Sequence, residues 1–426
     1  MSPARPASAP SLAGATPVPS PGRSRGGSIL IGFADALAAP EVAASLLAAG
    51  YEVAAFARRG RKVSLRALRG VELIELTAPE QDLAACEAEL AGLAASYDLV
   101  MPLDDQAVFV CEEALGPDAP LAGPRGTQAR LALDKRQQLL AAEAAGLEAP
   151  PWQLLTPRAG APQGAPPEWK LPVELKLPVV LKPALAAERR DGRLRRLAPR
   201  LVRDAAQARE LCEAWGPRTA TIVQRWVSGT GAGVFGIADE SGIHNLSAHR
   251  RVRMMNPAGS GSSACASAPV PKELVGPIER MLGEAGWRGL FMVELLRADG
   301  QWWFMELNGR PWGSMALARR LGYEYPAWAA ARALDPQASL PAAPRRKIEG
   351  ELTCRHLGRE LVHLMFVLRG PGSHPGAWPG RARTVKDLLR GGHSSAWYNR
   401  GPGMRRLFLD DTLRTVAAQT WAKGRS

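Results

Sequence analysis

The chain has 426 residues, more than one ordinary hydrophobic core organises, so we expect two or three packed domains. Hydrophobic residues make up 46% and charged residues 22%, which is typical of soluble globular proteins, and no apolar run approaches the length of a membrane span. The net charge of +13 favours anionic partners such as nucleotides, phosphate esters, carboxylates or nucleic acid, although the arginine preference of a GC-rich genome would give the same excess.

The cysteines and the N-terminal segment indicate the cellular compartment of the protein. None of the five cysteines forms a CxxC pair or a zinc-ligand pattern, which indicates reduced thiols and predicts a cytoplasmic protein. Residues 1–27 lack the apolar stretch of a secretory signal and are rich in Pro, Ser and Ala. We therefore expect this segment to be a disordered tail.

Alternating strands and helices predict a Rossmann-like domain over residues 28–122. The expected strands are residues 28–33, 51–56, 71–76 and 98–102, and the expected helices are residues 39–49 and 81–95. Such alternation is typical of parallel βαβ units. The first turn from strand to helix reads Gly32-Phe33-Ala34-Asp35 and lacks GxGxxG, which argues against a dinucleotide site.

The rest of the chain predicts an α+β domain followed by an extension. Residues 123–147 look helical and bridge to a proline-rich connection at 150–172. Residues 173–230 hold short strands around a helix at 204–215, which predicts a small subdomain of about residues 150–230. Residues 231–340 hold alternating strands, a helix near 274–285 and a hairpin. We expect residues 341–426 to form a helical C-terminal extension.

The hairpin at residues 289–310 carries two glutamates at matched positions. Two apolar runs flank Asp299-Gly300, a strong turn signal. With a three-residue loop centred on Gly300, Glu294 and Glu306 would face each other with their Cβ atoms about 4.5–5.5 Å apart. A two-residue turn would instead shift the register by one residue and place the glutamates on opposite faces.

Two opposed carboxylates repel each other and call for a cation or a shared proton. Asn308 follows Glu306 by two residues and so adds an oxygen ligand on the same face. Oxygen ligands suit a hard divalent ion, so the hairpin predicts a Mg²⁺ (or Mn²⁺) site at Glu294, Glu306 and Asn308. The alternative is a solvated strand face.

Two lysines stand in apolar settings in a chain where lysine is scarce. Lys182 ends the buried strand pattern at residues 177–183, where an ammonium group needs an anion. Lys135 belongs to an expected helix around residues 130–136, where a lysine is usually solvated. Further along, the strand at residues 220–227 runs into a turn of small residues at 228–231.

These segments, in this order, resemble the ATP-grasp superfamily. The shared pattern is a helix lysine, a VVLKP strand, a hinge strand, a VELL acidic strand and an MELNxR acidic strand. The resemblance spans about residues 28–330. It implies a Rossmann-like domain followed by a two-subdomain ATP-grasp fold that holds ATP between the subdomains.

The resemblance also implies residue roles. Lys135 and Lys182 would contact phosphates, and Arg310 would contact the transferring phosphate or the acyl group, since a guanidinium offers paired donors. Glu294, Glu306 and Asn308 would hold Mg²⁺. The main chain of the hinge would hydrogen-bond adenine, at residues Gln224, Arg225, Trp226 and Val227.

Three positions depart from the superfamily pattern. The loop after Lys182 is rich in arginine rather than glycine and offers charge rather than backbone amides. Gly231 stands where relatives often place an acid for the ribose. Gly309-Arg310 replaces the usual proline-then-arginine order, although the arginine keeps its place.

Residues 247–263 hold a basic cluster before a Gly/Ser loop. In relatives an arginine before such a loop lies near the acceptor carboxylate, so we expect Arg251 or Arg250 to contact substrate. Strand alternation would place Arg251 and Arg253 on one face, and His249 is expected to be structural. Asp104-Asp105 ends the fourth strand, where either a helix cap or a ligand contact is possible and the cap is favoured.

The expected function is an ATP- and Mg²⁺-dependent ligase that activates a small carboxylate as an acyl phosphate for attack by an amine or similar nucleophile. One alternative is a biotin carboxylase-like or carbamoyl-forming enzyme that uses bicarbonate. Another is a non-enzymatic basic protein that binds nucleotides or nucleic acid, for which no known signature is present. A homodimer is possible, and no membrane partner is expected.

Overall fold

The computed structural model describes residues 26–155, 175–216, 219–259, 261–344, 350–372, 376–389 and 395–421. The tail predicted at residues 1–27 lies almost wholly outside the described residues. The described chain has the expected mixed α/β class, with a four-stranded parallel sheet, a four-stranded antiparallel sheet, a seven-stranded mixed sheet and a short hairpin. No helix in the described segments is long and apolar enough to span a membrane.

The N-terminal sheet has the predicted parallel βαβ arrangement, in strand order β3-β2-β1-β4. Its apolar strands are largely buried because helices cover them, as parallel sheets require. The strands are β1 (Ser28–Gly32), β2 (Glu52–Arg58), β3 (Val71–Leu76) and β4 (Leu99–Pro102), and the helices are α1 (Ala39–Ala48), η1 (Ser64–Ala67), α2 (Leu83–Ala94) and α3 (Asp105–Ala114).

The bridging segment forms two helices rather than the single one expected. These are α4 (Thr127–Leu133) and α5 (Lys135–Ala144), separated by Asp134 in an extended conformation. The Asp134 carboxylate accepts hydrogen bonds from the amides of Arg136 and Gln137. Aspartate is a strong N-cap because it satisfies the free amides of a first turn. Lys135 therefore begins a helix instead of lying inside one.

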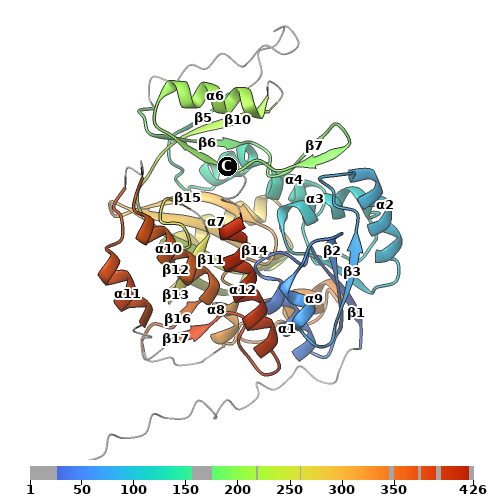
Figure 1. Ribbon diagram of the computed structural model, residues 1–426. Coiled ribbons are helices and arrows are strands. Elements are labelled where there is room, and N and C mark those ends of the chain that lie inside the picture. The colour runs from blue at the N-terminus through green and yellow to red at the C-terminus, as the bar shows by residue number, and fades with distance from the viewer. Residues whose placement is uncertain are drawn as a thin grey trace, which may run out of the picture.

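The small subdomain is an antiparallel sheet covered by one helix, seen at the top of Figure 1. Its strand order is β5-β10-β6-β9, and the buried side of α6 packs on Val179, Leu181 and Val223. The elements are β5 (Trp152–Leu155), β6 (Val179–Pro183), β9 (Arg200–Val202), α6 (Ala205–Trp215) and β10 (Thr221–Arg225). Most of the proline-rich connection lies outside the described residues.

A seven-stranded sheet forms the body of the molecule, in order β15-β14-β11-β12-β13-β16-β17. Alternate side chains serve its two faces: Val234 and Val293 pack in the cluster of α7, while Phe235 and Met292 pack toward α9 and the N-terminal domain. The elements are β11 (Thr230–Asp239), β12 (Gly242–Met254), β13 (Ser262–Ala268), α7 (Lys272–Glu284), β14 (Gly289–Ala298), β15 (Gln301–Asn308), α8 (Met315–Arg320) and α9 (Tyr325–Leu334).

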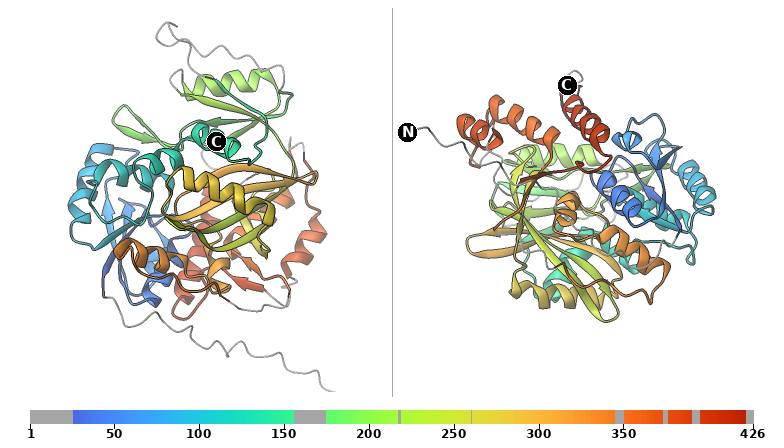
Figure 2. Two further views of the ribbon diagram at one scale, coloured as in Figure 1. Left: turned by 180° about the vertical axis from the view of Figure 1, so that it is seen from behind. Right: turned by 90° about the horizontal axis from the view of Figure 1, so that it is seen from below.

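The C-terminal region is more than the helical extension we expected. It contains α10 (Leu357–Arg369), α11 (Arg381–Leu389) and α12 (Arg405–Trp421), but β16 (Thr353–Arg355) and β17 (Ser395–Trp397) complete the large sheet. Strands of three residues are too short to show an alternating pattern in sequence. This region is therefore built into the body of the fold, as the red elements in Figure 2 show.

A buried carboxylate joins three parts of the chain. Glu41 of α1 is 1% exposed and pairs with Arg319 at 2.5 Å and Arg320 at 3.3 Å. It also accepts the amide of Asn399 at 2.8 Å. A buried carboxylate is tolerated only with such partners. This contact, with the apolar cluster that runs from β1 to α9, holds the N-terminal domain against the large sheet and the C-terminal region.

Candidate functional site

The acidic hairpin has the predicted cross-strand pair, but its turn and its register differ from those expected. Its turn has two residues, Asp299 and Gly300, both with positive φ, and Ala298 pairs with Gln301. Strict alternation from this turn would separate the glutamates. A β-bulge at Met305 shifts the register back by one residue, so that Glu294 pairs with Glu306. The predicted three-residue loop is wrong. The predicted cross-strand pair is confirmed, because the bulge turns Glu306 to the same face of the sheet as Glu294.

The three predicted metal ligands line one cavity. Glu294, Glu306 and Asn308 border a hollow of about 120 Å³, and the Asn308 side-chain amide donates to Glu306 at 3.3 Å. Glu294 pairs with Arg251 at 2.6 Å. No cluster of three His, Cys, Asp or Glu side chains that could hold a metal occurs among the described residues. Two carboxylates and one amide oxygen would fill only part of the coordination sphere of a divalent ion, so its other ligands would be water or phosphate oxygens.

Lys182 lies on β6 within the electrostatic range of both glutamates. Burial lowers the pKa of Lys182, Glu306 and Glu294 act to raise it, and Lys135 acts to lower it, and the net pKa is about 8. A lysine of this kind charges most readily when an additional anion approaches. The fold thus places the strand lysine within reach of the charges of both glutamates. The phosphate contact expected for Lys182 stays a prediction.

Lys135 is positioned by two contacts of α5. Its backbone amide donates to the carbonyl of Ala184, just beyond the Lys182 strand, at 2.8 Å. One turn later, Gln138 clamps the backbone of Leu307 with bonds of 2.9 and 3.0 Å. Since Leu307 follows Glu306, these contacts fix the start of α5 relative to both the strand lysine and the acidic hairpin.

Arg310 has a partner that the sequence did not single out. Its Nε donates to the Asp105 carboxylate at 2.9 Å. Burial opposes ionisation of Asp105, but the charge of Arg310 outweighs it and holds the Asp105 pKa below its ordinary value. The adjacent Asp104 caps α3 by accepting the Ala107 amide at 2.7 Å. The cap favoured at this pair is confirmed for Asp104, while Asp105 faces the site.

The hinge residues follow the end of β10. Gln224 is 1% exposed and pairs with Val180 of β6. Arg225 is exposed, stacks over Trp303 at 5.2 Å, and its amide already donates to the Pro151 carbonyl. Trp226 and Val227 lie beyond the strand. An adenine contact at this hinge would therefore fall on backbone groups other than the Arg225 amide.

The basic cluster divides between two directions. Arg251 enters the cavity, whereas Arg250 pairs with the exposed Glu351 at 2.6 Å, so Arg251 is the residue at the site. A bulge follows Arg251, and Arg253 pairs with Glu360 rather than sharing the Arg251 position. The simple alternation expected for Arg251 and Arg253 is wrong because this extra residue interrupts it.

Gly231 makes room for the Arg251 side chain. A Cβ at Gly231 would lie 2.5 Å from Arg251 Cδ. The acid that relatives often carry at this position would therefore collide with the arginine. This chain exchanges a possible ribose contact for a guanidinium that reaches Glu294.

His249 is buried among aromatic and hydroxyl groups. Its ring meets Phe235 edge to face at 4.8 Å, and Nδ1 shares a hydrogen bond with Ser314 at 2.7 Å. Burial and, to a smaller extent, the charge of Arg251 lower the pKa of His249 to about 3, so the ring is neutral at physiological pH. This environment agrees with the structural role expected, although His249 also borders the cavity.

The arginine-rich loop after Lys182 is a hairpin docked on the N-terminal domain. Strands β7 (Glu188–Arg190) and β8 (Arg193–Arg195) form it, and Arg189 pairs with Glu87 and Glu113 at 2.7 Å each. Leu194 is 1% exposed in the core cluster of α2 and α3. Part of the arginine charge is thus committed to protein contacts, while Arg196 lies within the electrostatic range of Asp105.

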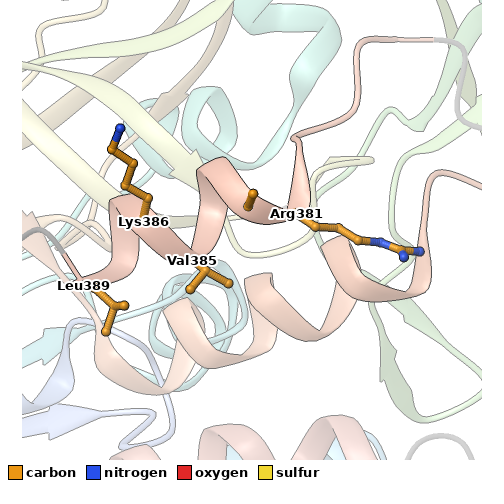
Figure 3. A pocket seen from close by; sticks show the side chains of 5 residues that line it. Arg381, Val385, Lys386 and Leu389 are labelled. Atoms are coloured by element: carbon orange, nitrogen blue, oxygen red, sulfur yellow. The ribbon is translucent and has the colours of Figure 1, made fainter.

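A second hollow lies along α11 and differs in character. Figure 3 shows Val385, Leu389, Lys386 and Arg381, with the two basic side chains extending in different directions. It is a shallow surface, open to solvent, and among the described residues it is bordered only by residues of this helix. It contains no carboxylate and no convergent polar groups, so it offers no chemistry comparable to the cavity at the acidic hairpin.

Comparison with known proteins identifies the fold. No family model and no curated protein matches the sequence. The structure is similar to L-amino acid ligase from Bacillus licheniformis (TM-score 0.53, 16% identity, 74% of this chain and 75% of that one). It is also similar to the ADP complex of N5-carboxyaminoimidazole ribonucleotide synthetase (TM-score 0.56, 20% identity, 82% and 85%).

A third similar structure is the biotin carboxylase domain of Hydrogenobacter thermophilus 2-oxoglutarate carboxylase, solved with MgADP, ADP and bicarbonate (TM-score 0.55, 14% identity, 76% and 73%). These proteins are ATP-grasp enzymes. The chain therefore has the ATP-grasp fold that its motifs predicted.

Sequence reasoning did not connect four residues with the site: Asp105, Gln138, Arg359 and Tyr398. Asp105 was recognised only as a residue at a strand end, and Gln138 had no signal beyond a helical pattern. Arg359 and Tyr398 line the cavity from the C-terminal region, where many arginines look alike in sequence. Their roles depend on contacts between distant segments.

Proposed function

We propose that this protein is an ATP- and Mg²⁺-dependent ligase that activates a small carboxylate as an acyl phosphate, which an amine or similar nucleophile then attacks. The observation that carries the proposal is that Glu294 and Glu306 pair across two strands, line one cavity and lie within the electrostatic range of Lys182. The ATP-grasp fold, shared with ligases solved with ADP or MgADP, supports it.

The acidic pair suits a divalent cation. Glu294 and Glu306 lie opposite each other, and Asn308 adds an oxygen beside them. Arg251 supplies a positive charge next to Glu294, and this ion pair supports the proposal that the position suits a cation. Mg²⁺ held by these residues would neutralise phosphate oxygens of the bound nucleotide.

The basic residues suit the charge that moves during phosphoryl transfer. Lys135 and Lys182 would hold the phosphates from one side, and Arg310 would face the oxygen of the acid or its acyl group. Asp105 keeps the Arg310 guanidinium oriented through the 2.9 Å bond. Such fixed charges accelerate transfer mainly by positioning and electrostatic stabilisation.

The proposed reaction has two balanced steps. A carboxylate oxygen attacks the γ-phosphorus of ATP, the bond from that phosphorus to the β-γ bridging oxygen breaks, and ADP leaves. The nitrogen of an amine then attacks the acyl carbon, the bond to the phosphate oxygen breaks, and phosphate leaves while the amine loses a proton to solvent. Arg310 is placed to steady the oxyanion of the second step.

Bicarbonate is the competing acid, because the biotin carboxylase domain from Hydrogenobacter thermophilus, solved with bicarbonate, has a similar fold. ADP release that needs bicarbonate alone would favour that alternative. Nucleic-acid binding through the net charge of +13 is a rival that we do not expect, and binding that weakens steeply with salt would support it. A homodimer and a cytoplasmic location stay predictions as well.

The direct test measures ADP release by the full chain with a panel of carboxylic acids and amines. We expect release to require ATP, Mg²⁺ and one acid, and Glu306→Gln to lower it roughly 100-fold or more while the thermal unfolding profile is retained. Glu284→Gln is the matched control, because Glu284 is exposed on α7. Near-normal turnover by Glu306→Gln would refute the metal assignment, and no ADP release with any acid, bicarbonate included, would refute the function.

A further inference from the structure

The cavity at the acidic hairpin has one wall from the C-terminal region. Alongside Glu294, Glu306 and Arg310 it is lined by Arg359 of α10 and by Tyr398, which follows β17. Helix α10 packs against β13, the neighbour of the strand that carries Arg251. The C-terminal region therefore brings a guanidinium into the same enclosure as the proposed reaction centre.

Arg359 lacks a carboxylate partner among the described residues. The other two arginines of the cavity are paired, Arg251 with Glu294 and Arg310 with Asp105. Among the described residues, the only hydrogen-bond acceptor of the Arg359 side chain is the backbone carbonyl of Ser262, at 3.1 Å. The charge of Asp411 also acts on Arg359, but the Asp411 carboxylate is already paired with His356 and bonded to Asn399, at 2.9 Å each. A guanidinium has five N–H donors, so most of its donor capacity is available to a ligand.

Nearby arginines differ from Arg359 because they have carboxylate partners. Arg253 and Arg355 both pair with the buried Glu360, at 2.7 and 3.0 Å. Burial lowers the pKa of Arg359, whereas at Arg251 the charge of Glu294 outweighs burial and raises the pKa. A partly buried cation without an acid is costly unless an anion arrives from outside the chain.

Further polar atoms around the cavity also lack partners in the described structure. They are His249 Nε2, Arg251 Nε and Trp312 Nε1, each of them buried. The Trp312 and His249 residues are only 1% and 3% exposed. Buried polar atoms normally have hydrogen-bond partners, so these three unpaired atoms mark the walls of this hollow as polar and incompletely satisfied within the described residues.

We propose that the acid substrate carries a second anionic group, a carboxylate or a phosphate, and that Arg359 is the residue that selects for it. This inference rests on the proposed activation of a carboxylate in the same cavity. The reacting carboxylate would lie toward Arg310 and the acidic pair, and the second anion would bind the Arg359 guanidinium as a paired acceptor.

The distribution of charge in the cavity favours an anionic group beside Arg359 over a neutral or cationic one. Lys135, Lys182 and a divalent ion at the glutamates already oppose the charge of a nucleotide. A reacting carboxylate would be met by Arg310, with Arg251 released from Glu294 when the metal binds. Arg359 remains, and a neutral or cationic group placed there would leave its charge uncompensated.

The test uses pairs of acids that differ in the second anion: aspartate and asparagine, glutamate and glutamine, and 3-phosphoglycerate and glycerate. ADP release is measured for the full chain with ammonia and a fixed set of amino acids as nucleophiles. We expect the dianionic member of at least one pair to have a kcat/KM roughly tenfold or more above its partner. The carboxylate and phosphate pairs show which anion is preferred.

Arg359→Gln should lower kcat/KM for the preferred dianion roughly 30-fold or more, and leave its partner acid and the KM for ATP within about threefold. Arg359→Lys, which retains charge but loses the paired donors, should recover part of the loss. The control is Arg369→Gln, an exposed arginine at the end of the same helix. An equal loss for both members of every pair would mean a structural role for Arg359 and would overturn the proposal.

Binding separates failure of this inference from failure of the function. Each acid is added with ADP and Mg²⁺ at equal concentration, and the thermal unfolding temperature is measured for the unaltered chain and for Arg359→Gln. If no acid supports ADP release, a greater stabilisation by the dianion that disappears in Arg359→Gln still supports the anion site. Equal stabilisation by both members of every pair, together with equal turnover, overturns it.

Discussion

Replacing Lys182 with methionine should stabilise the protein while abolishing ATP turnover. Burial lowers the pKa of Lys182 from 10.5 to about 8. At about 1.4 kcal/mol for each pH unit, this corresponds to roughly 3 kcal/mol against the charged form in the folded state. Methionine has a similar length without the charge, so Lys182→Met removes that cost together with the phosphate contact.

The effect has a defined pH window. Below about pH 8 the lysine is protonated in both folded and unfolded chains, so the full cost of the buried charge is present. Between about pH 8 and 10.5 the folded lysine loses its proton while the unfolded one keeps it, and the unaltered protein gains stability as pH rises. The advantage of Lys182→Met should therefore be largest at neutral pH and disappear toward pH 10.5.

The measurement is thermal unfolding across this pH range. At about 2–4 °C for each kcal/mol, we expect Lys182→Met to unfold several degrees above the unaltered chain at pH 7. Lys176→Met is the control, because Lys176 is exposed just before the same strand. A difference between Lys182→Met and the unaltered chain that is absent at pH 7, or that does not change with pH, would refute the burial argument.

Activity gives a second measurement of the same group. The kcat/KM for ATP should fall about tenfold for each pH unit above about 8, because the free enzyme loses the Lys182 ammonium there. Lys182→Arg keeps its charge at higher pH and should move this fall upward. A pH profile that is identical in Lys182→Arg would exclude Lys182 as the titrating group.

Two further predictions concern contacts between domains. Asp105→Asn should leave Arg310 without its acid and lower the free energy of unfolding by roughly 1–3 kcal/mol. A double-mutant cycle of Asp105→Asn with Arg310→Gln, measured by thermal unfolding, should show a coupling energy between the two residues that independent sites lack. For the docked hairpin, Arg189→Gln should change stability by less than about 1 kcal/mol because its ion pairs are exposed. Leu194→Ala, in contrast, removes buried contacts worth roughly 2–5 kcal/mol and should make the hairpin sensitive to trypsin; equal trypsin sensitivity of the two variants would contradict this order.

Much of the site could be predicted because its chemistry is local in sequence. Strand β6 ends in a lysine after an apolar run, and β14 and β15 each carry one glutamate among buried residues. A charge inside such a pattern is costly, so its presence indicates function without knowledge of the fold. The order of these segments then led to the ATP-grasp resemblance, which the structure confirms at the level of fold.

The hairpin shows where local reasoning reached the right pairing for the wrong reason. Asp299-Gly300 does form a turn, but its two-residue geometry alone would have placed Glu306 on the other face. Gln138 of α5 holds the backbone of Leu307, two residues beyond the bulge at Met305. A contact across 169 residues leaves no signal in the hairpin sequence.

The sequence by itself determined the parallel N-terminal sheet, the lysine and glutamate positions and the ATP-grasp order, because periodicity and misplaced charge are encoded over a few residues. Only the tertiary structure decided which charges meet. It paired Arg310 with Asp105, turned Arg250 away from the cavity, and brought Arg359 into it from the C-terminal region. Ion pairing depends on distances of a few ångströms between segments hundreds of residues apart, and those distances exist only once the domains have packed.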